Sequence, residues 1–178
     1  MKILNCIEFG NPILRLKAKK VSLRFLRSGE GKDLIKNMIY TMRKSKGIGL
    51  AAPQIGKSLQ IIVMEIRSTP ERPKQKHKGP IVVINPKIIN FSRKIVNGWE
   101  ACLSLSRIYA LVPRSKTITV EYYNQKGDKI VEKASDLWAR IFQHEADHLY
   151  GLSFMDKVKN LKSVMTASEF KKKNAKKK

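Results

Sequence analysis

Residues 136–151 of this 178-residue chain read D-L-W-A-R-I-F-Q-H-E-A-D-H-L-Y-G. Asp136 can serve as an N-cap and Gly151 as a C-terminal stop. Four apolar residues between these ends recur at helical spacing: Leu137, Ile141, Phe142 and Leu149. The stretch therefore predicts an amphipathic helix.

Two histidines on this helix, His144 and His148, stand four residues apart, so both rings lie on one face and can reach one metal ion. Glu145 sits about 100° round the helix from His144, which suits proton transfer with a metal-bound water better than coordination. This is the H-E-x-x-H pattern. The alternative is an amphipathic helix whose two histidines are a partly buried pair. A catalytic metal also requires a third protein ligand and an open position for water.

The composition is that of one soluble globular domain, with 42% hydrophobic residues. The longest apolar run, 61–64, is far too short to cross a membrane. Asn5 and Glu8 interrupt any secretory signal at the start of the chain. Two cysteines do not make a disulfide framework, so we expect a cytoplasmic protein, or an organellar one if a transit peptide has been removed.

The charge is strongly basic, with 37 Lys and Arg against 14 Asp and Glu, a net +23. Such a surplus predicts attraction to RNA or DNA, with strong salt dependence. The alternative is a lysine-rich surface that only keeps the protein soluble. Charge alone names no partner.

The remaining chain predicts an α+β fold in which short antiparallel strands pack around the central metal-binding helix. We expect an N-terminal helix over 32–46, a turn-like stretch over 47–56, and a polar loop over 71–79 with a solvated His77. Extended segments are expected at 60–66, 81–84, 87–91, 94–105, 116–123 and 129–133, with a hairpin turn at 124–128. Residues 1–160 form a single catalytic domain in this interpretation, and 161–178 a lysine-rich C-terminal tail that is solvated, frayed or anion-binding.

The third ligand is expected to be a cysteine thiolate, because a thiolate with two imidazoles suits a tetrahedral metal whose fourth position holds water. Cys102 lies in the extended stretch E-A-C-L-S, 100–104. Cys6 is the competing thiol, and the residues alone favour Cys102 only modestly, since free cysteines are usually small buried hydrophobes.

Three motifs in order, G-I-G-L-A-A-P-Q at 47–54, E-A-C-L-S at 100–104 and Q-H-E-A-D-H-L at 143–149, resemble the signature motifs of the peptide deformylases. The L-V-P-R at 111–114 and N-P at 85–86 fit as well, so the resemblance extends to about residue 160. It implies one metal ion held by Cys102, His144 and His148. The ion is usually Fe²⁺, with Zn²⁺, Ni²⁺ or Co²⁺ as substitutes. It also implies removal of the formyl group from the N-terminal formylmethionine of new polypeptides, which gives formate and a free Met.

The same resemblance assigns roles around the metal. Glu145 takes a proton from water and returns it to the departing amine. The side-chain amide of Gln54 and the backbone N–H of Leu103 act as oxyanion donors. The peptide lies as an added strand along the backbone of the following residues: Ile48, Gly49 and Ala101. Asp147 either holds a histidine ring or is a helix-surface carboxylate.

Two residues depart from the family pattern. Ala101 stands where the family has glycine, beside the substrate strand, and Ser106 stands where many relatives have proline. Neither is a metal ligand, so we expect an active enzyme. Related enzymes use a C-terminal segment to dock on ribosomes, so the lysines of 171–173 and 176–178 predict ribosome or rRNA association by a monomeric protein.

Two other functions fit parts of the pattern. A small zinc metalloprotease also uses H-E-x-x-H, but its third ligand usually lies downstream, where the sequence offers the acids Asp156 and Glu169. A catalytically weak, ribosome- or RNA-associated deformylase-like protein would keep the fold as a scaffold. Loss of metal on replacing Cys102, and hydrolysis of a formyl-Met peptide, separate these alternatives.

Overall fold

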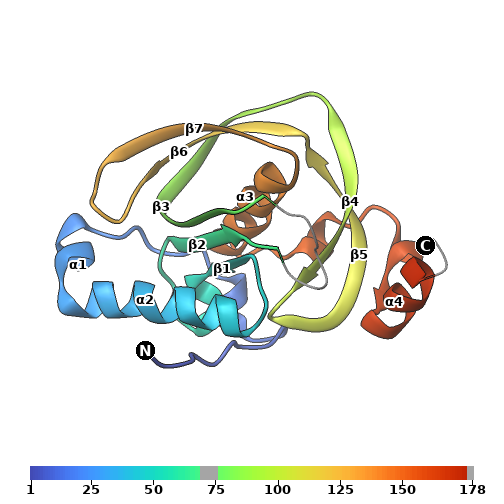
Figure 1. Ribbon diagram of the computed structural model, residues 1–178, viewed down its shortest axis with the longest axis horizontal. Helices are drawn as coiled ribbons and strands as arrows, with labels where there is room; N and C mark the ends of the chain where they lie inside the picture. Colours follow the sequence, from blue (N-terminus) through green and yellow to red (C-terminus); the bar gives the residue numbers. More distant parts are fainter. Residues whose placement is uncertain (69–75, 176–178) are drawn as a thin grey trace.

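The computed structural model describes residues 1–68 and 76–175. It combines helices with two antiparallel sheets, as the α+β prediction required (Figure 1). The helices are α1 (Leu23–Arg27), α2 (Gly29–Lys44), α3 (Asp136–Leu149) and α4 (Ala167–Ala175), and the short 3-10 turns are Pro12–Arg15, Ala52–Ile55, Phe154–Lys157 and Leu161–Ser163. The strands are β1 (Gly49–Ala51), β2 (Ile61–Ile66), β3 (Lys78–Phe91), β4 (Ile95–Cys102), β5 (Leu105–Ser115), β6 (Thr117–Tyr123), β7 (Lys129–Ser135) and β8 (Met165–Thr166).

The fold contains two sheets, and each ends in an edge strand that has a strand partner on one side only. The larger sheet has the order β1-β2-β3-β6-β7, and the smaller has the order β4-β5-β8. Strand β1 ends one sheet and strand β4 ends the other, so each has one side without a strand partner. Helix α3 contacts strands of both sheets. It buries its apolar face in the main core with Trp138, Ile141, Phe142 and Leu149.

Helix α3 covers the stretch predicted as the central helix, with one change at its start. The N-cap is Ser135, whose backbone is extended, and not Asp136, which is the first helical residue with φ 53°. The C-cap is Tyr150, and Gly151 follows with φ 73°, a left-handed conformation that glycine adopts without strain. A Cβ at Gly151 would also overlap the backbone of Arg15, so this stop is held by packing as well.

The first half of the chain differs from the sequence prediction in detail. Helix α2 corresponds to the helix expected at 32–46 but begins three residues earlier, because the Ser28 hydroxyl caps the N–H of Gly31. The stretch expected as turn-like at 47–56 contains strand β1 and a 3-10 turn. Residues 71–75 of the predicted polar loop lie outside the described residues, and His77 is 62% exposed in its side chain.

The two strands expected at 81–84 and 87–91 are one strand, β3. The prediction of a break at Asn85-Pro86 is wrong, because the break is a register shift between Ile84 and Lys87 within a continuous strand. Asn85 has φ 49°, and its side chain accepts from the Val21 N–H at 2.8 Å and donates to the Val21 carbonyl at 2.9 Å. The backbone N–H of Asn85 donates to the Gln60 carbonyl at 3.0 Å, so the irregular residue is held on both sides.

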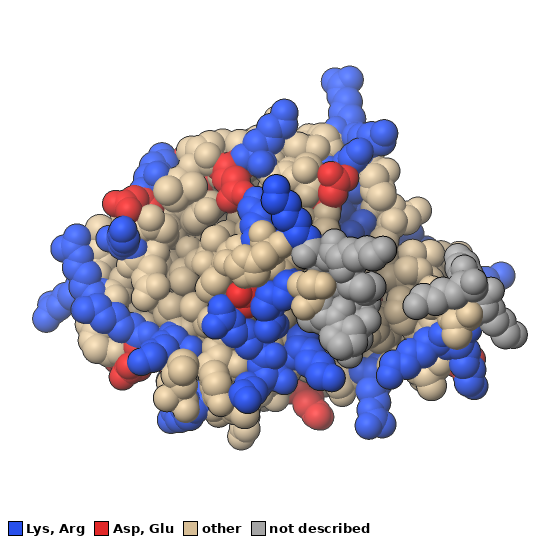
Figure 2. Space-filling view, in the orientation of Figure 1, with Lys and Arg blue, Asp and Glu red and all other residues tan. Residues whose placement is uncertain are grey.

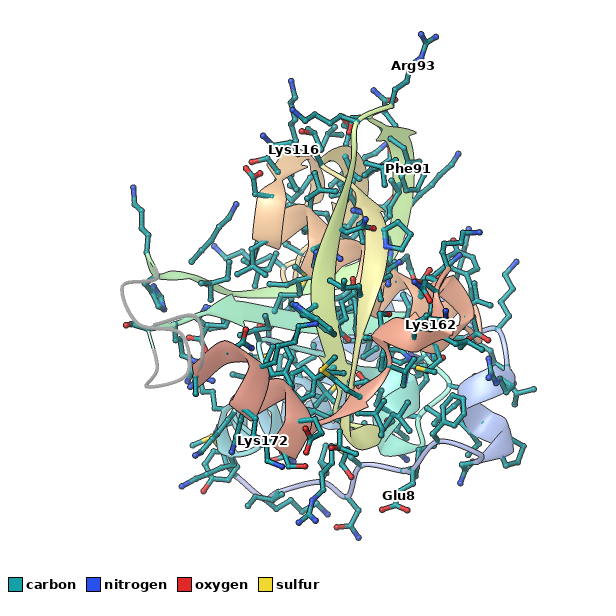
Figure 3. The ribbon with its side chains drawn as sticks, turned by 90° about the vertical axis from the view of Figure 1, so that its right-hand side faces the viewer. Glu8, Phe91, Arg93, Lys116, Lys162 and Lys172 are labelled. Atoms are coloured by element: carbon teal, nitrogen blue, oxygen red, sulfur yellow. The ribbon has the colours of Figure 1, made fainter. Side chains whose placement is uncertain are left out.

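Part of the predicted tail is folded against the smaller sheet. Strand β8 pairs with β5 through Ile108↔Thr166 and Tyr109↔Met165. Figure 3, in which Lys172 is labelled, shows helix α4 alongside the β4–β5 pair. Phe170 of α4 stacks on Tyr109 with ring centroids 4.2 Å apart. The sequence missed this docking because one phenylalanine among lysines carries little helical periodicity.

Lys and Arg side chains are spread over the face shown in Figure 2 and gather at its lower centre, while acidic groups there are few. No helix among residues 1–68 and 76–175 is long and apolar enough to span a membrane.

Candidate active site

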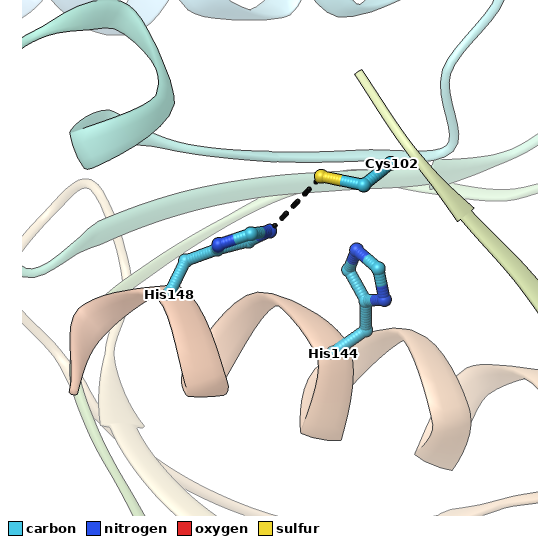
Figure 4. Close-up of side chains that lie close together, drawn as sticks. All are labelled: Cys102, His144 and His148. Carbon is cyan, nitrogen blue, oxygen red and sulfur yellow. Dashed lines mark hydrogen bonds between the residues drawn. The ribbon is translucent and has the colours of Figure 1, made fainter. Parts of the chain in front are cut away.

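The site is built where the last residue of strand β4 meets the buried face of helix α3. Cys102 Sγ and one ring nitrogen from each of His144 and His148 lie within 4.8 Å of one another (Figure 4). Cys102 Sγ is 3.3 Å from His148 Nε2. All three side chains are buried. A thiolate and two imidazoles in one small volume are a donor set suited to a divalent transition metal with one position left open.

Glu100 is a site residue that the sequence analysis did not single out. Its carboxylate Oε2 accepts from His144 Nδ1 at 2.8 Å and is almost fully buried. This bond orients the His144 ring and leaves the other nitrogen for a metal. The signal was available in E-A-C-L-S, because residues two apart in a strand share a face, which puts Glu100 beside Cys102.

Two arginines hold the Glu100 carboxylate in turn. Arg114 donates to it twice, from Nε and Nη2, each at 3.0 Å. Arg140 of helix α3 donates at 2.7 Å. Of the two readings of Asp147, the structure does not support the one in which it holds a histidine ring. Its carboxylate accepts from Arg114 Nη1 at 2.6 Å, so it acts on the site through Arg114.

The neighbours of Glu100 and Cys102 stabilise the charged forms of these two side chains. Burial raises the pKa of Glu100, but hydrogen bonds from His144 and Arg114 outweigh it and lower the pKa to about 2. Burial also raises the pKa of the Cys102 thiol, but the charge of His148 and hydrogen bonds from both histidines bring it well below its usual value. A thiol that loses its proton easily is what a metal site requires.

Glu145 lies beside the ligands without a hydrogen-bond partner for one of its oxygens. Its side chain is buried, and Oε2 has no partner within the described part of the chain. Burial raises its pKa to about 7, against the opposing charges of His144 and His148. A buried carboxyl that titrates near neutral pH and keeps an oxygen free is suited to take and return a proton.

Gly49 packs directly against this carboxylate. A Cβ on residue 49 would lie 2.7 Å from Glu145 Cδ and would overlap one carboxylate oxygen. Strand β1 and helix α3 can therefore lie this close together only because residue 49 is glycine.

The two expected oxyanion donors, Gln54 and Leu103, both lie next to Cys102. Gln54 Nε2 donates to Cys102 Sγ at 3.2 Å, and Gln54 Oε1 accepts from the Ala51 N–H at 2.8 Å, which fixes the amide. Leu103 follows Cys102 in the turn from β4 to β5. A Cβ on Gly47 would lie 3.2 Å from the Leu103 side chain, so this turn packs against the segment that leads into β1.

The expected substrate-binding residues lie on the two free edges. Gly49 belongs to β1, and Ile48 directly precedes it. Ala101 belongs to β4 and is exposed. Both edges reach the site, because Gly49 packs against Glu145 and Ala101 directly precedes Cys102.

The competing ligands are not part of the Cys102, His144 and His148 cluster. Cys6 is half-buried, and burial and the charges of Cys102 and Glu145 raise its pKa, which is unlike a metal-binding thiol. Asp156 pairs with Arg15 at 2.7 Å, and Glu169 pairs with Lys172 on α4 at 2.7 Å. The downstream acids that a metalloprotease would use are thus engaged in other contacts.

The antiparallel fold, the Cys-His-His cluster and the buried neighbouring glutamate define a class, the metal-dependent hydrolases. Within that class, the family model described as polypeptide deformylase matches residues 3–164. The chain belongs to this family, whose members are metal-dependent hydrolases that remove N-formyl groups.

Two curated relatives match this chain over most of their length. Peptide deformylase 2 of Nostoc sp. is 39% identical over 169 residues, 95% of this chain and 93% of the relative. Peptide deformylase of Thermotoga maritima is 37% identical over 158 residues, 88% of each chain.

Solved structures show the same fold. Class I type b peptide deformylase from Acinetobacter baumannii, solved with Met-Ala-Ser bound, has a TM-score of 0.85 at 33% identity, over 88% of this chain and 99% of that one. Peptide deformylase from Thermotoga maritima has a TM-score of 0.80 at 36% identity, over 90% and 100%.

Proposed function

We propose that this protein removes the formyl group from the formylmethionine of nascent polypeptides with one divalent metal ion held by Cys102, His144 and His148. The observation that carries the proposal is the grouping of these three ligand atoms within 4.8 Å beside a buried glutamate. Fe²⁺ is the proposed native ion, with Zn²⁺, Ni²⁺ or Co²⁺ as substitutes. When bound, the ion supplies a Lewis acid for the formyl oxygen and lowers the pKa of a coordinated water.

The proton transfers are assigned to Glu145. It takes a proton from the attacking water as the C–O bond forms at the formyl carbon. It then returns the proton to the amine nitrogen as the C–N bond breaks and formate leaves. The unpartnered Oε2 and the pKa of about 7 both support this role.

Stabilisation of the negative charge that develops on the formyl oxygen is assigned to two donors, Gln54 Nε2 and the Leu103 N–H. One such donor contributes about 3 kcal/mol of transition-state stabilisation. The bond from Gln54 Nε2 to Cys102 Sγ supports this assignment.

The peptide is proposed to add as a strand between β1 and β4, bonding to Ile48, Gly49 and Ala101. The free edges of both strands support this placement. Ala101 is exposed, and its methyl group takes the place of the glycine hydrogen of relatives beside the substrate. Ser106 is exposed in strand β5, and Arg107 after it has φ 68°.

A cytoplasmic monomer that associates with ribosomes is also part of this proposal. The +23 charge and the lysines of 171–173 and 176–178 support attraction to rRNA. The test is co-sedimentation with ribosomes across a salt series, comparing the full chain with one ending at Ala175. The shorter chain removes three lysines and keeps α4, so its binding at low salt should be weaker. Equal co-sedimentation of both chains would show that these lysines do not dock the protein.

The function is tested by formate release from formyl-Met-Ala-Ser with anaerobically purified protein. The wild type should carry about one metal per chain and hydrolyse the peptide, while Cys102→Ala should lose both metal and activity. Full metal occupancy in Cys102→Ala would contradict the ligand set. Digestion of an unformylated protein such as casein, with no formate release, would favour the metalloprotease instead.

A further inference from the structure

Helix α4 brings a third aromatic ring to two rings of the smaller sheet. Phe170 stacks on Tyr109 with centroids 4.2 Å apart, and lies edge-on to Trp99 at 5.1 Å. Lys173, one helical turn further on, has its ammonium 5.3 Å from the Trp99 ring centroid. All three rings are half-buried, so part of each remains open to solvent. We call Trp99, Tyr109 and Phe170 the aromatic shelf.

The shelf lies on the same face of β4 as Ala101. The register between β4 and β5 shifts between Glu100 and Cys102, so the burial decides which residues share a face here. Glu100 and Cys102 are buried on one face, while Ala101 is exposed and Trp99 half-buried on the other. Two residues of a strand span roughly 7 Å, which puts Ala101 next to the shelf.

The backbone of Ala101 also faces the free edge. Cys102 pairs with Leu105 across the two-residue turn, so the N–H and C=O groups of Cys102 point toward β5. By alternation, those of Ala101 point toward the free edge of β4. In a β-ladder, residues directly opposite each other place their side chains on the same face. A peptide residue that pairs with Ala101 therefore directs its side chain toward the shelf.

We propose that α4 completes the peptide groove, with the aromatic shelf as a subsite for a side chain downstream of the formylmethionine. The subsite favours large apolar and aromatic side chains, because they bury surface against three rings in edge-on and stacked geometries. Lys173 at its rim disfavours cationic side chains there. This inference rests on the proposed function, because it requires a formyl-Met peptide that adds to the edge of β4.

The test compares kcat/KM for formyl-Met-Ala-Ser peptides in which the second or third residue is replaced in turn by Phe, Leu or Lys. At the position that pairs with Ala101, the wild type should prefer Phe over Ala by about 5-fold, with Lys lowest. Phe170→Ala should reduce this preference, measured as the ratio of kcat/KM for the Phe and Ala peptides, to near unity. Phe170→Leu, which keeps an apolar side chain, should retain part of it.

Lys171→Ala is the matched control, because Lys171 is an exposed neighbour on the same helix and should leave the Phe preference as in wild type. The outcomes separate the two proposals. Absence of formate release from any formyl peptide by metal-loaded wild type would overturn the proposed function. Hydrolysis with no Phe preference at either position, or a preference that survives Phe170→Ala, would overturn the subsite and leave the proposed function standing.

Discussion

The Glu100 carboxylate and the His144 ring form a 2.8 Å hydrogen bond between groups that are both almost fully buried. Because His144 is a proposed metal ligand, this bond fixes which of its nitrogens faces the metal. The same carboxylate neutralises Arg114 and Arg140, so a single residue links ligand geometry to the charge balance of the core.

Glu100→Ala should therefore weaken both metal binding and folding. Loss of the orienting bond should lower metal affinity about 10- to 100-fold. Leaving the buried Arg114 without its main partner should cost about 3 kcal/mol or more of unfolding free energy. Metal titration and urea unfolding measure the two effects. Glu100→Gln, which keeps an acceptor for His144, should lose less metal affinity than Glu100→Ala. Equal affinity in wild type and Glu100→Ala would show that the bond does not position the ligand.

Glu145→Gln should separate metal binding from catalysis. The amide is close in shape to the carboxylate and can still lie against Gly49, so fold and metal content should match wild type. Because it cannot accept a proton, kcat should fall about 100-fold or more. Single-turnover formate release with metal content measured on the same sample is the required assay. Turnover close to wild type in the metal-loaded variant would assign the base to another group.

The sequence allowed His144, His148 and Glu145 to be proposed because their spacing in one helix is local information, whereas Cys102 was only modestly favoured by the residues and was assigned through the family resemblance. It also placed β2, the β6–β7 hairpin and the α+β class, where alternation and turn residues dominate. Contacts between distant segments were not accessible in the same way. Asn85 keeps β3 continuous through bonds to Val21, 64 residues away, and Phe170 docks α4 on Tyr109. The sequence left two interpretations of Asp147 open, because its partner Arg114 comes from β5.

Gly49→Ala should impair catalysis through one added methyl group. The new Cβ would overlap the Glu145 carboxylate, so either the carboxylate rotates away or β1 moves outward. We expect kcat/KM to fall at least 10-fold, since displacement of a catalytic group by about 1 Å can cost 100-fold. Gly29→Ala is the matched control, because a Cβ there meets nothing within 4 Å and activity should not change. Wild-type kcat/KM in Gly49→Ala would show that the groove tolerates this shift.

The buried Glu65 side chain of β2 allows a prediction of how the stability of the fold depends on pH. It is 2% exposed and accepts from Arg43 twice, each bond at 2.8 Å, while Arg67 lies 3.1 Å away and also donates to the Gly47 carbonyl. Burial raises the pKa of Glu65, but hydrogen bonds from Arg43 and His77 outweigh it, and the pKa lies below its usual value. A carboxyl with a lowered pKa in the folded state contributes stability that is present above its unfolded pKa of about 4.3. This stability is lost as pH falls through the folded pKa.

Glu65→Gln should therefore reduce the free energy of unfolding by about 2 kcal/mol at neutral pH. The difference from wild type should stay constant down to about pH 5 and shrink as pH falls below the unfolded pKa of about 4.3. Urea unfolding of both proteins across this range measures it, and subtraction removes the pH dependence that they share. Glu121→Gln is the control, because its ion pair with Lys129 is partly exposed and should contribute less than about 0.5 kcal/mol. A difference that grows as pH falls below 4.5 would have the wrong sign for a carboxylate held by Arg43 and Arg67, and would contradict the role assigned to this cluster.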